Sequence, residues 1–147
     1  ANASLHAAIV AVGLYSSVSS ISDHVTVNVL EDDDFVVSYT AENKRKLSVQ
    51  YERVVSWAKK NAIDYAPGVN AAFFLWVDLG KAYKARHPEL ETEDVTDLVM
   101  NKLMDRKVFL ASGQVFGSEK PGWFRIVFSH PDEYLDLGLQ RVMEALQ

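Results

Sequence analysis

The chain has 147 residues, of which 48% are hydrophobic and 24% charged, a composition typical of a globular domain. Because it contains no cysteine, disulfide frameworks, thiolate zinc sites and cysteine nucleophiles are excluded. The net charge of −5 offers no electrostatic footprint for nucleic acid or an anionic membrane, so we expect neither partner.

The N-terminal residues carry no clear signal for targeting or membrane insertion. The most apolar early stretch, Leu5 to Tyr15, is shorter than the roughly 20 residues that a spanning helix needs. No basic region precedes it, which argues against a secretory signal. We therefore expect a cytoplasmic protein.

The first half of the chain is predicted to be helical. An alanine-rich helix over Ser4–Tyr15 is followed by a polar break at Ser16–Ser20 and a second helix to Leu30. The acidic run Glu31–Asp34 suits a helix N-terminus, because acids complement the helix dipole there. From Phe35 to Ala62 the spacing predicts one long amphipathic helix. Its apolar stripe comprises Leu47, Tyr51, Val54, Val55 and Ala58.

The middle of the chain mixes strand and helix patterns. The continuous apolar run Ala71–Val77 favours a buried strand, and Leu79–Arg86 favours a short helix closed by Pro88. Thr92 is predicted to cap a further helix, whose apolar stripe begins at Val95.

The last third is predicted to hold two strands and a helix. The strands cover Val108–Ala111 and Trp123–Phe128, with a glycine-rich loop from Ser112 to Gly122 between them. Pro131 opens the last helix. We therefore expect an α/β (α+β) fold in which a small mixed sheet is covered by helices, with a long N-terminal helix.

Several common functional motifs are absent from the sequence. The glycine-rich loop contains neither GxGxxG nor GxxxxGK[ST], and no HExxH or GxSxG occurs. The four histidines lack the spacing of metal ligands, so no metal site is expected.

Arg125 is the residue whose placement requires an explanation. Strand alternation puts it beside Trp123 and Val127, on the face opposite Phe124 and Ile126. A guanidinium in so apolar a strand must be solvated, paired or bound to a ligand. An exposed face or an internal ion pair would explain it. Alternatively, its planar fork of donors suits bidentate binding of a small carboxylate.

Four segments of the chain match one family in the order in which that family has them. The most specific is Pro-Gly-Trp-Phe-Arg, which ends at Arg125 and is followed by an apolar strand. The others are the serine-rich turn Ser16–Ser20, the helical segment Tyr39–Asn43 and the strand segment Asn70–Leu79. Together they resemble the C-terminal part of fold-type I pyridoxal-phosphate (PLP) enzymes, and among these the 1-aminocyclopropane-1-carboxylate (ACC) synthase-like aminotransferases.

The resemblance implies roles for three residues of this chain. Arg125 matches the arginine that binds the α-carboxylate of an amino acid substrate. Ser17 and Ser19 match a turn that lies near the active site of the neighbouring subunit in a homodimer.

The resemblance also implies a longer enzyme than this chain. The family binds PLP as a Schiff base on a lysine in a Ser-x-Ser-Lys motif, and none of the nine lysines here lies in such a motif. Residues 1–20 would be a remnant of the large PLP-binding domain, and residues 21–147 the C-terminal small domain. The fragment itself would be inactive and would hold no PLP. The large domain, with which it would pack in the longer enzyme, would be missing.

The expected function is therefore that of the C-terminal fragment of a class I/II aminotransferase-like enzyme of amino acid metabolism, acting at Cα of its substrate. Two alternatives stay open: a PLP-dependent lyase parent (ACC synthase or a C–S/β-lyase), and a stand-alone interaction module that reuses the fold without catalysis. The loop Gln114–Phe116 differs from the polar loop of plant ACC synthases, which argues against ACC formation.

Overall fold

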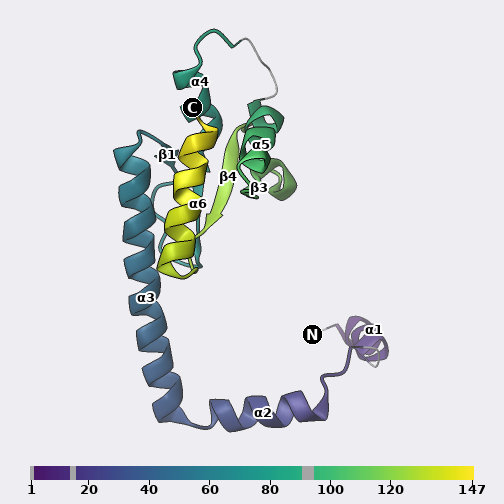
Figure 1. The fold of residues 1–147 in the computed structure, drawn as a ribbon. Helices are drawn as coiled ribbons and strands as arrows, with labels where there is room; N and C mark the ends of the chain where they lie inside the picture. Colours follow the sequence, from purple (N-terminus) through teal and green to yellow (C-terminus); the bar gives the residue numbers. More distant parts are fainter. Residues whose placement is uncertain (1, 14–15, 91–94) are drawn as a thin grey trace. The chain divides into compact units, whose positions relative to one another are not determined.

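The computed structural model describes residues 2–13, 16–90 and 95–147 (Figure 1). The chain divides into two compact units, Ala1–Asn43 and Lys44–Gln147. These units are defined by contacts within the structure. The domain boundary expected after residue 20 comes from the family resemblance instead, and it stays a prediction.

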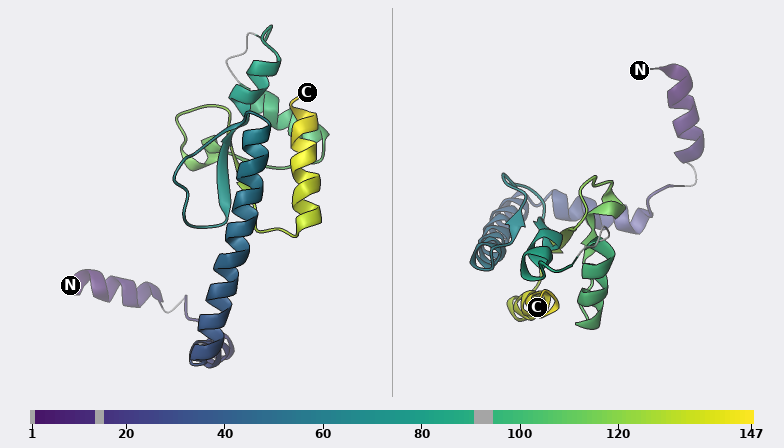
Figure 2. Two further views of the ribbon diagram at one scale, coloured as in Figure 1. Left: turned by 90° about the vertical axis from the view of Figure 1, so that its left-hand side faces the viewer. Right: turned by 90° about the horizontal axis from the view of Figure 1, so that it is seen from above.

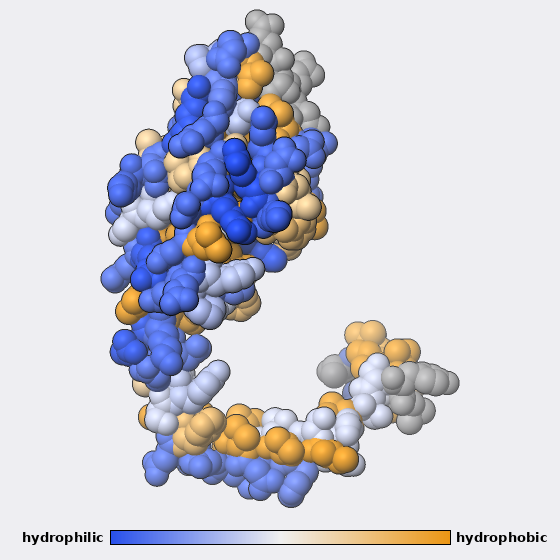
Figure 3. Space-filling model, in the orientation of Figure 1, coloured by the Kyte–Doolittle hydropathy of each residue, from blue (hydrophilic) through white to orange (hydrophobic). Residues whose placement is uncertain are grey.

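The first unit consists of helices. It holds α1 (Ala3–Gly13), α2 (Ser20–Leu30) and the beginning of α3 (Asp33–Lys60), in agreement with the predicted helices. The carboxylate of Asp32 accepts a hydrogen bond of 2.9 Å from the backbone N–H of Phe35, so the acidic run does begin a helix. None of the described residues of α1 and α2 is buried, and Figure 3 shows hydrophobic side chains gathered along α2.

The second unit is built on a four-stranded sheet. Its strands β1 (Asp64–Tyr65), β2 (Phe74–Asp78), β4 (Trp123–Val127) and β3 (Ala111–Ser112) lie in the order β1-β2-β4-β3. Every pairing among the described strands is antiparallel, so the expectation of a sheet mixed in strand direction was wrong. The expectation of a small sheet combined with covering helices is confirmed.

The helices of the second unit agree with the sequence patterns. They are the C-terminal part of α3, α4 (Leu79–Arg86), α5 (Val95–Asp105) and α6 (Asp132–Ala145). A short 3-10 turn, η1 (Gly113–Phe116), lies within the predicted loop. Thr92, the predicted N-cap, lies outside the described residues.

Two predicted strands are shorter than expected, for local reasons. β2 begins at Phe74 because Ala72 has a φ of +65°, which an extended strand does not allow. β3 is reduced to two residues because the chain before it completes the end of α5. There Lys107 has a φ of +59°, and the N–H of Val108 donates to the carbonyl of Leu103 at 2.9 Å.

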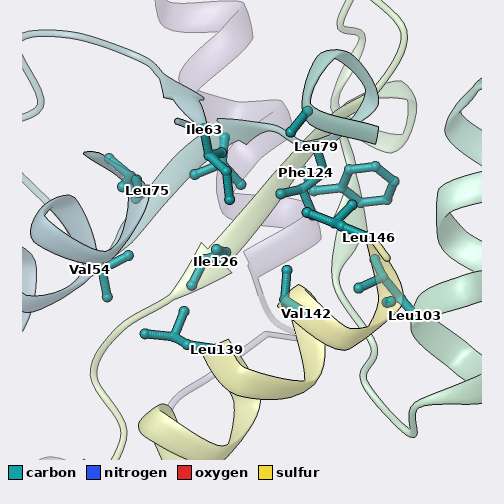
Figure 4. Packing of buried hydrophobic residues seen from close by; sticks show 14 of the residues in the cluster. Val54, Ile63, Leu75, Leu79, Leu103, Phe124, Ile126, Leu139, Val142 and Leu146 are labelled. Carbon is teal, nitrogen blue, oxygen red and sulfur yellow. The ribbon is translucent and has the colours of Figure 1, made fainter. Parts of the chain in front are cut away.

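The core lies between one face of the sheet and the helices. This inner face carries Leu75, Val77, Phe124 and Ile126, all of them buried. Figure 4 shows these strands packed with residues of α3, α5 and α6, and Figure 2 shows the same helices around the sheet. From the predicted stripe of α3, the buried residues are Val54, Val55 and Ala58. The opposite face of the sheet is left with half-buried side chains.

Candidate functional site

The outer face of the sheet carries six half-buried side chains from the two central strands: Phe74, Trp76, Asp78, Trp123, Arg125 and Val127. Within this outer face, Arg125 is paired with Trp76 of β2 on one side and with Ala111 of β3 on the other. Its backbone is therefore fixed by strands on both sides, and strand alternation places it as the sequence predicted.

The guanidinium of Arg125 lies against aromatic rings. Its Cζ atom is 4.4 Å from the ring centroid of Phe116 and 5.0 Å from that of Phe74, both within the range of cation–π attraction. Its Nε atom is buried and has no hydrogen-bond partner within residues 2–13, 16–90 and 95–147. Within the described part of the chain no carboxylate pairs with Arg125, so an internal ion pair does not explain its position.

Phe116 reaches Arg125 because the turn that carries it is compact. The N–H of Ser118 donates to the carbonyl of Gly113 at 2.9 Å, and Gly117 takes the left-handed conformation with a φ of +75°. The ring of Phe116 also contacts the edge of Trp76, with 5.5 Å between the ring centroids. Sequence reasoning missed this residue, because it lies in a stretch that was predicted as an irregular loop.

A cavity of about 260 Å³ borders the same strand. Its wall is formed by residues 107–111, by Arg125, Ile126 and Val127 of β4, and by one side of α6. The wall includes the cations Lys107, Arg125 and Arg141, and none of its described residues is acidic. This lining favours negative charge over positive charge in the vicinity of Arg125.

Asp78, at the end of β2, is the acidic residue of the outer face among these six side chains. It pairs with Trp123 in the sheet, and its carboxylate accepts a hydrogen bond of 2.8 Å from the N–H of Lys81 at the start of α4. Burial raises the pKa of Asp78 above its ordinary value, with a smaller contribution in the same direction from Asp64. Lys81 is engaged with Asp64, which raises the pKa of the Lys81 ammonium.

These contacts predict that Asp78 contributes to stability as a helix cap and not as a charge. Asp78→Ala should lower the free energy of unfolding by about 1 kcal/mol, whereas Asp78→Asn keeps the cap and should have little effect. Because the folded chain binds a proton at Asp78 more tightly than the unfolded chain, this group contributes most stability at low pH. That contribution decreases as the pH rises through the raised pKa.

Urea unfolding of the wild-type chain and the Asn variant over a range of pH tests this sign. The stability of Asp78→Asn relative to wild type should increase as the pH rises. A relative stability that instead decreases would show that the carboxylate is stabilised by its neighbours rather than penalised by burial.

Ser17 and Ser19 lie in the first unit, whereas Arg125 lies in the second. Both are exposed, and Ser19 holds the N-cap position of α2 without a side-chain capping hydrogen bond. Their predicted place near the active site of a neighbouring subunit stays a prediction.

The lysines of this chain lie outside the outer face that carries Arg125. All nine lysine side chains are exposed, on α3, α4 and α5 or in loops, and none belongs to the outer face. The described residues contain no group of three or more potential metal ligands. The helices formed by these residues all lack the length and hydropathy of a membrane-spanning segment.

The helices packed on an antiparallel sheet form the kind of fold that the sequence predicted for an aminotransferase-like enzyme. In agreement, the sequence model of the family "Aminotransferase class I and II" matches residues 2–142. The chain belongs to this family of aminotransferase-like enzymes.

Relatives of known sequence come from animals and plants. The chain is 33% identical over 134 residues to "1-aminocyclopropane-1-carboxylate synthase-like protein 1" of Mus musculus, an alignment that covers 90% of this chain and 26% of that protein. It is 30% identical over 129 residues to "1-aminocyclopropane-1-carboxylate synthase 11" of Arabidopsis thaliana, covering 87% and 27%. The chain thus spans about a quarter of the length of these relatives.

Solved aminotransferases share the fold. An aspartate aminotransferase from Thermotoga maritima matches with a TM-score of 0.64 and 23% identity, over 91% of this chain and 30% of its own. A PLP-bound putative aminotransferase from Clostridium difficile 630 matches with a TM-score of 0.62 and 21% identity, over 75% of this chain and 26% of its own. The predicted fold and family are confirmed by these matches and the family assignment.

Proposed function

We propose that this chain is the C-terminal part of a longer PLP-dependent enzyme of the aminotransferase type, in which Arg125 binds the α-carboxylate of an amino acid substrate. The observation that carries the proposal is the guanidinium itself. It lies on a central strand, and no described residue offers its Nε a hydrogen-bond acceptor. A substrate carboxylate would accept charge-assisted hydrogen bonds from the N–H donors of this guanidinium.

The residues of this chain would bind and orient the substrate. Arg125 would fix the carboxylate, and the rigid sheet around it would limit rotation of the bound amino acid. The half-buried aromatic residues of the outer face would exclude water from the ion pair and strengthen it. When bound, the cofactor supplies an electron sink for the carbanion at Cα.

The attachment lysine and the remaining cofactor contacts would come from residues outside this chain. The exposed lysines and the span of about a quarter of the relatives support this assignment. As the resemblance implies, residues 1–20 would belong to the large domain and residues 21–147 to the small domain. This chain alone would be inactive, and the longer enzyme would be a homodimer with Ser17 and Ser19 near the partner's active site.

A first experiment tests the proposal on the natural, full-length protein. Its absorbance spectrum should show a visible band, and borohydride reduction followed by peptide mapping should place the cofactor on a lysine outside residues 1–147. A natural protein of 16.5 kDa without visible absorption would contradict the catalytic proposal. That result would favour a binding module that reuses the fold.

A lyase reaction is the second candidate, and the names of the relatives favour it. Product analysis of the full-length protein separates the two reactions. A 2-oxo acid formed only in the presence of an oxo-acid acceptor indicates transamination. Formation of ACC, or of ammonia and a 2-oxo acid without an acceptor, indicates a lyase. The cytoplasmic location expected from the sequence stays a prediction.

A further inference from the structure

We propose that Phe116 is a positioning residue, whose ring holds the guanidinium of Arg125 in the orientation that receives the substrate carboxylate. The inference rests on the proposed function. It adds a residue that acts through Arg125 and does not itself need to touch the substrate.

An aromatic ring acts on an arginine differently from a carboxylate, which is the common partner of a guanidinium. The Cζ atom of Arg125 is closer to the ring of Phe116, at 4.4 Å, than to that of Phe74, at 5.0 Å. A carboxylate partner would occupy the N–H donors of the guanidinium. An aromatic ring attracts the cation through its π face and leaves those donors free for a ligand.

The benefit of such a ring is entropic. An arginine side chain has many rotamers, and ordering it on ligand binding costs free energy. When Phe116 and Phe74 order the guanidinium in the free protein, that cost is no longer part of the binding step. Substrate binding is then tighter, although neither ring forms a hydrogen bond with the carboxylate.

The surroundings of Phe116 argue against a purely structural role. The side chain is 49% exposed and does not belong to the hydrophobic core. Apart from Arg125, its ring has an edge-to-face contact with Trp76. A residue that served only to fill space here would tolerate replacement by another apolar side chain.

Substitutions of Phe116 in the full-length protein test the proposal. Exchange of the Cα proton in D₂O, followed by proton NMR over a panel of L-amino acids, first identifies the amino acid that reacts fastest. For this amino acid, Phe116→Leu should lower kcat/KM about fivefold, chiefly through a higher KM. Phe116→Tyr keeps an aromatic ring and should retain near wild-type activity. The matched control is Val115→Ala, at the neighbouring and 76% exposed position of the same turn, which should change nothing.

A double-mutant cycle with Arg125→Lys shows whether Phe116 acts through Arg125. The effect of Phe116→Leu should largely disappear in the Lys variant, because the guanidinium that the ring positions is gone. Equal effects of Phe116→Leu in both backgrounds, or a Tyr variant as impaired as the Leu variant, would overturn the inference.

The same cycle separates this inference from the proposed function. If Arg125→Lys alone leaves kcat/KM unchanged, or no amino acid in the panel exchanges its Cα proton, the proposed function fails and this inference fails with it. If Arg125→Lys lowers kcat/KM but Phe116→Leu acts additively, the inference on Phe116 alone is wrong.

Discussion

Arg125→Ala is expected to lower kcat/KM of the full-length enzyme for its amino acid substrate by roughly 30- to 1,000-fold. This range corresponds to about 2–4 kcal/mol, the order of magnitude for losing charge-assisted hydrogen bonds between a guanidinium and a carboxylate. The effect should be large because, among the described residues, no carboxylate pairs with Arg125, so that its donors are free for the substrate.

Arg125→Lys should lie between the wild type and the Ala variant. An ammonium keeps the positive charge but not the planar fork of donors, so that the bidentate geometry is lost. A matched control is Arg53→Ala, which removes another half-buried guanidinium of the same unit. Arg53 contacts the carboxylates of Asp132 at 3.1 Å and Asp136 at 3.7 Å. Its loss should leave activity unchanged and lower stability by at most about 1 kcal/mol.

Steady-state kinetics with both variants and the control decide the role of Arg125. If Arg125→Ala changes kcat/KM no more than Arg53→Ala does, Arg125 does not bind the substrate carboxylate. A decrease in the Ala variant with no loss in the Lys variant would point to a long-range effect of charge instead of a bidentate clamp.

The outer-face position of Arg125 could be predicted from the sequence because side chains alternate along a strand. In Trp123–Phe128 the alternation is complete, and the buried residues Phe124 and Ile126 confirm the inner face. The long stripe of α3 was equally informative, since it spans several turns of one helix. Both patterns follow from the repeat of side chains along a single strand or helix. They can therefore be recognised without knowing which other elements pack against it.

Features that depend on turns or on distant residues could not be predicted in this way. Phe116 lies beside Arg125 only because of the turn that ends at Gly117, and strand periodicity gives no information about such a turn. Ala72 and Lys107 adopt positive φ angles, which are uncommon for residues with a side chain, and so the two adjoining strands were predicted too long. β1 has two residues and is too short to leave a pattern.

The approach of α4 to the start of β4 is the second feature with a large expected effect. The N–H of Gly80 donates to the carbonyl of Gly122 at 2.9 Å, and the N–H of Gly122 donates to the hydroxyl of Thr96 at 2.8 Å. A Cβ atom on Gly80 would lie 2.6 Å from the Cα of Gly122 and 3.0 Å from a methyl group of Val95. The nearest obstacle is backbone and cannot rotate away.

Gly80→Ala should therefore lower the free energy of unfolding by about 3 kcal/mol or more, because the helix and the strand must separate to admit one methyl group. Gly138→Ala is the matched control, the same substitution in another helix of the same unit. There no atom lies within 4 Å of the added Cβ, and alanine is the better helix former. This variant should be more stable than wild type by up to about 1 kcal/mol.

Urea unfolding of wild type, Gly80→Ala and Gly138→Ala, monitored by tryptophan fluorescence, measures both effects. The opposite signs matter most, since propensity alone predicts that alanine stabilises both helices. If Gly80→Ala is as stable as Gly138→Ala, the close approach of Gly80 to Gly122 does not exist in solution. The strand that carries Arg125 would then begin in a different position, and the geometry of the outer face would have to be determined again.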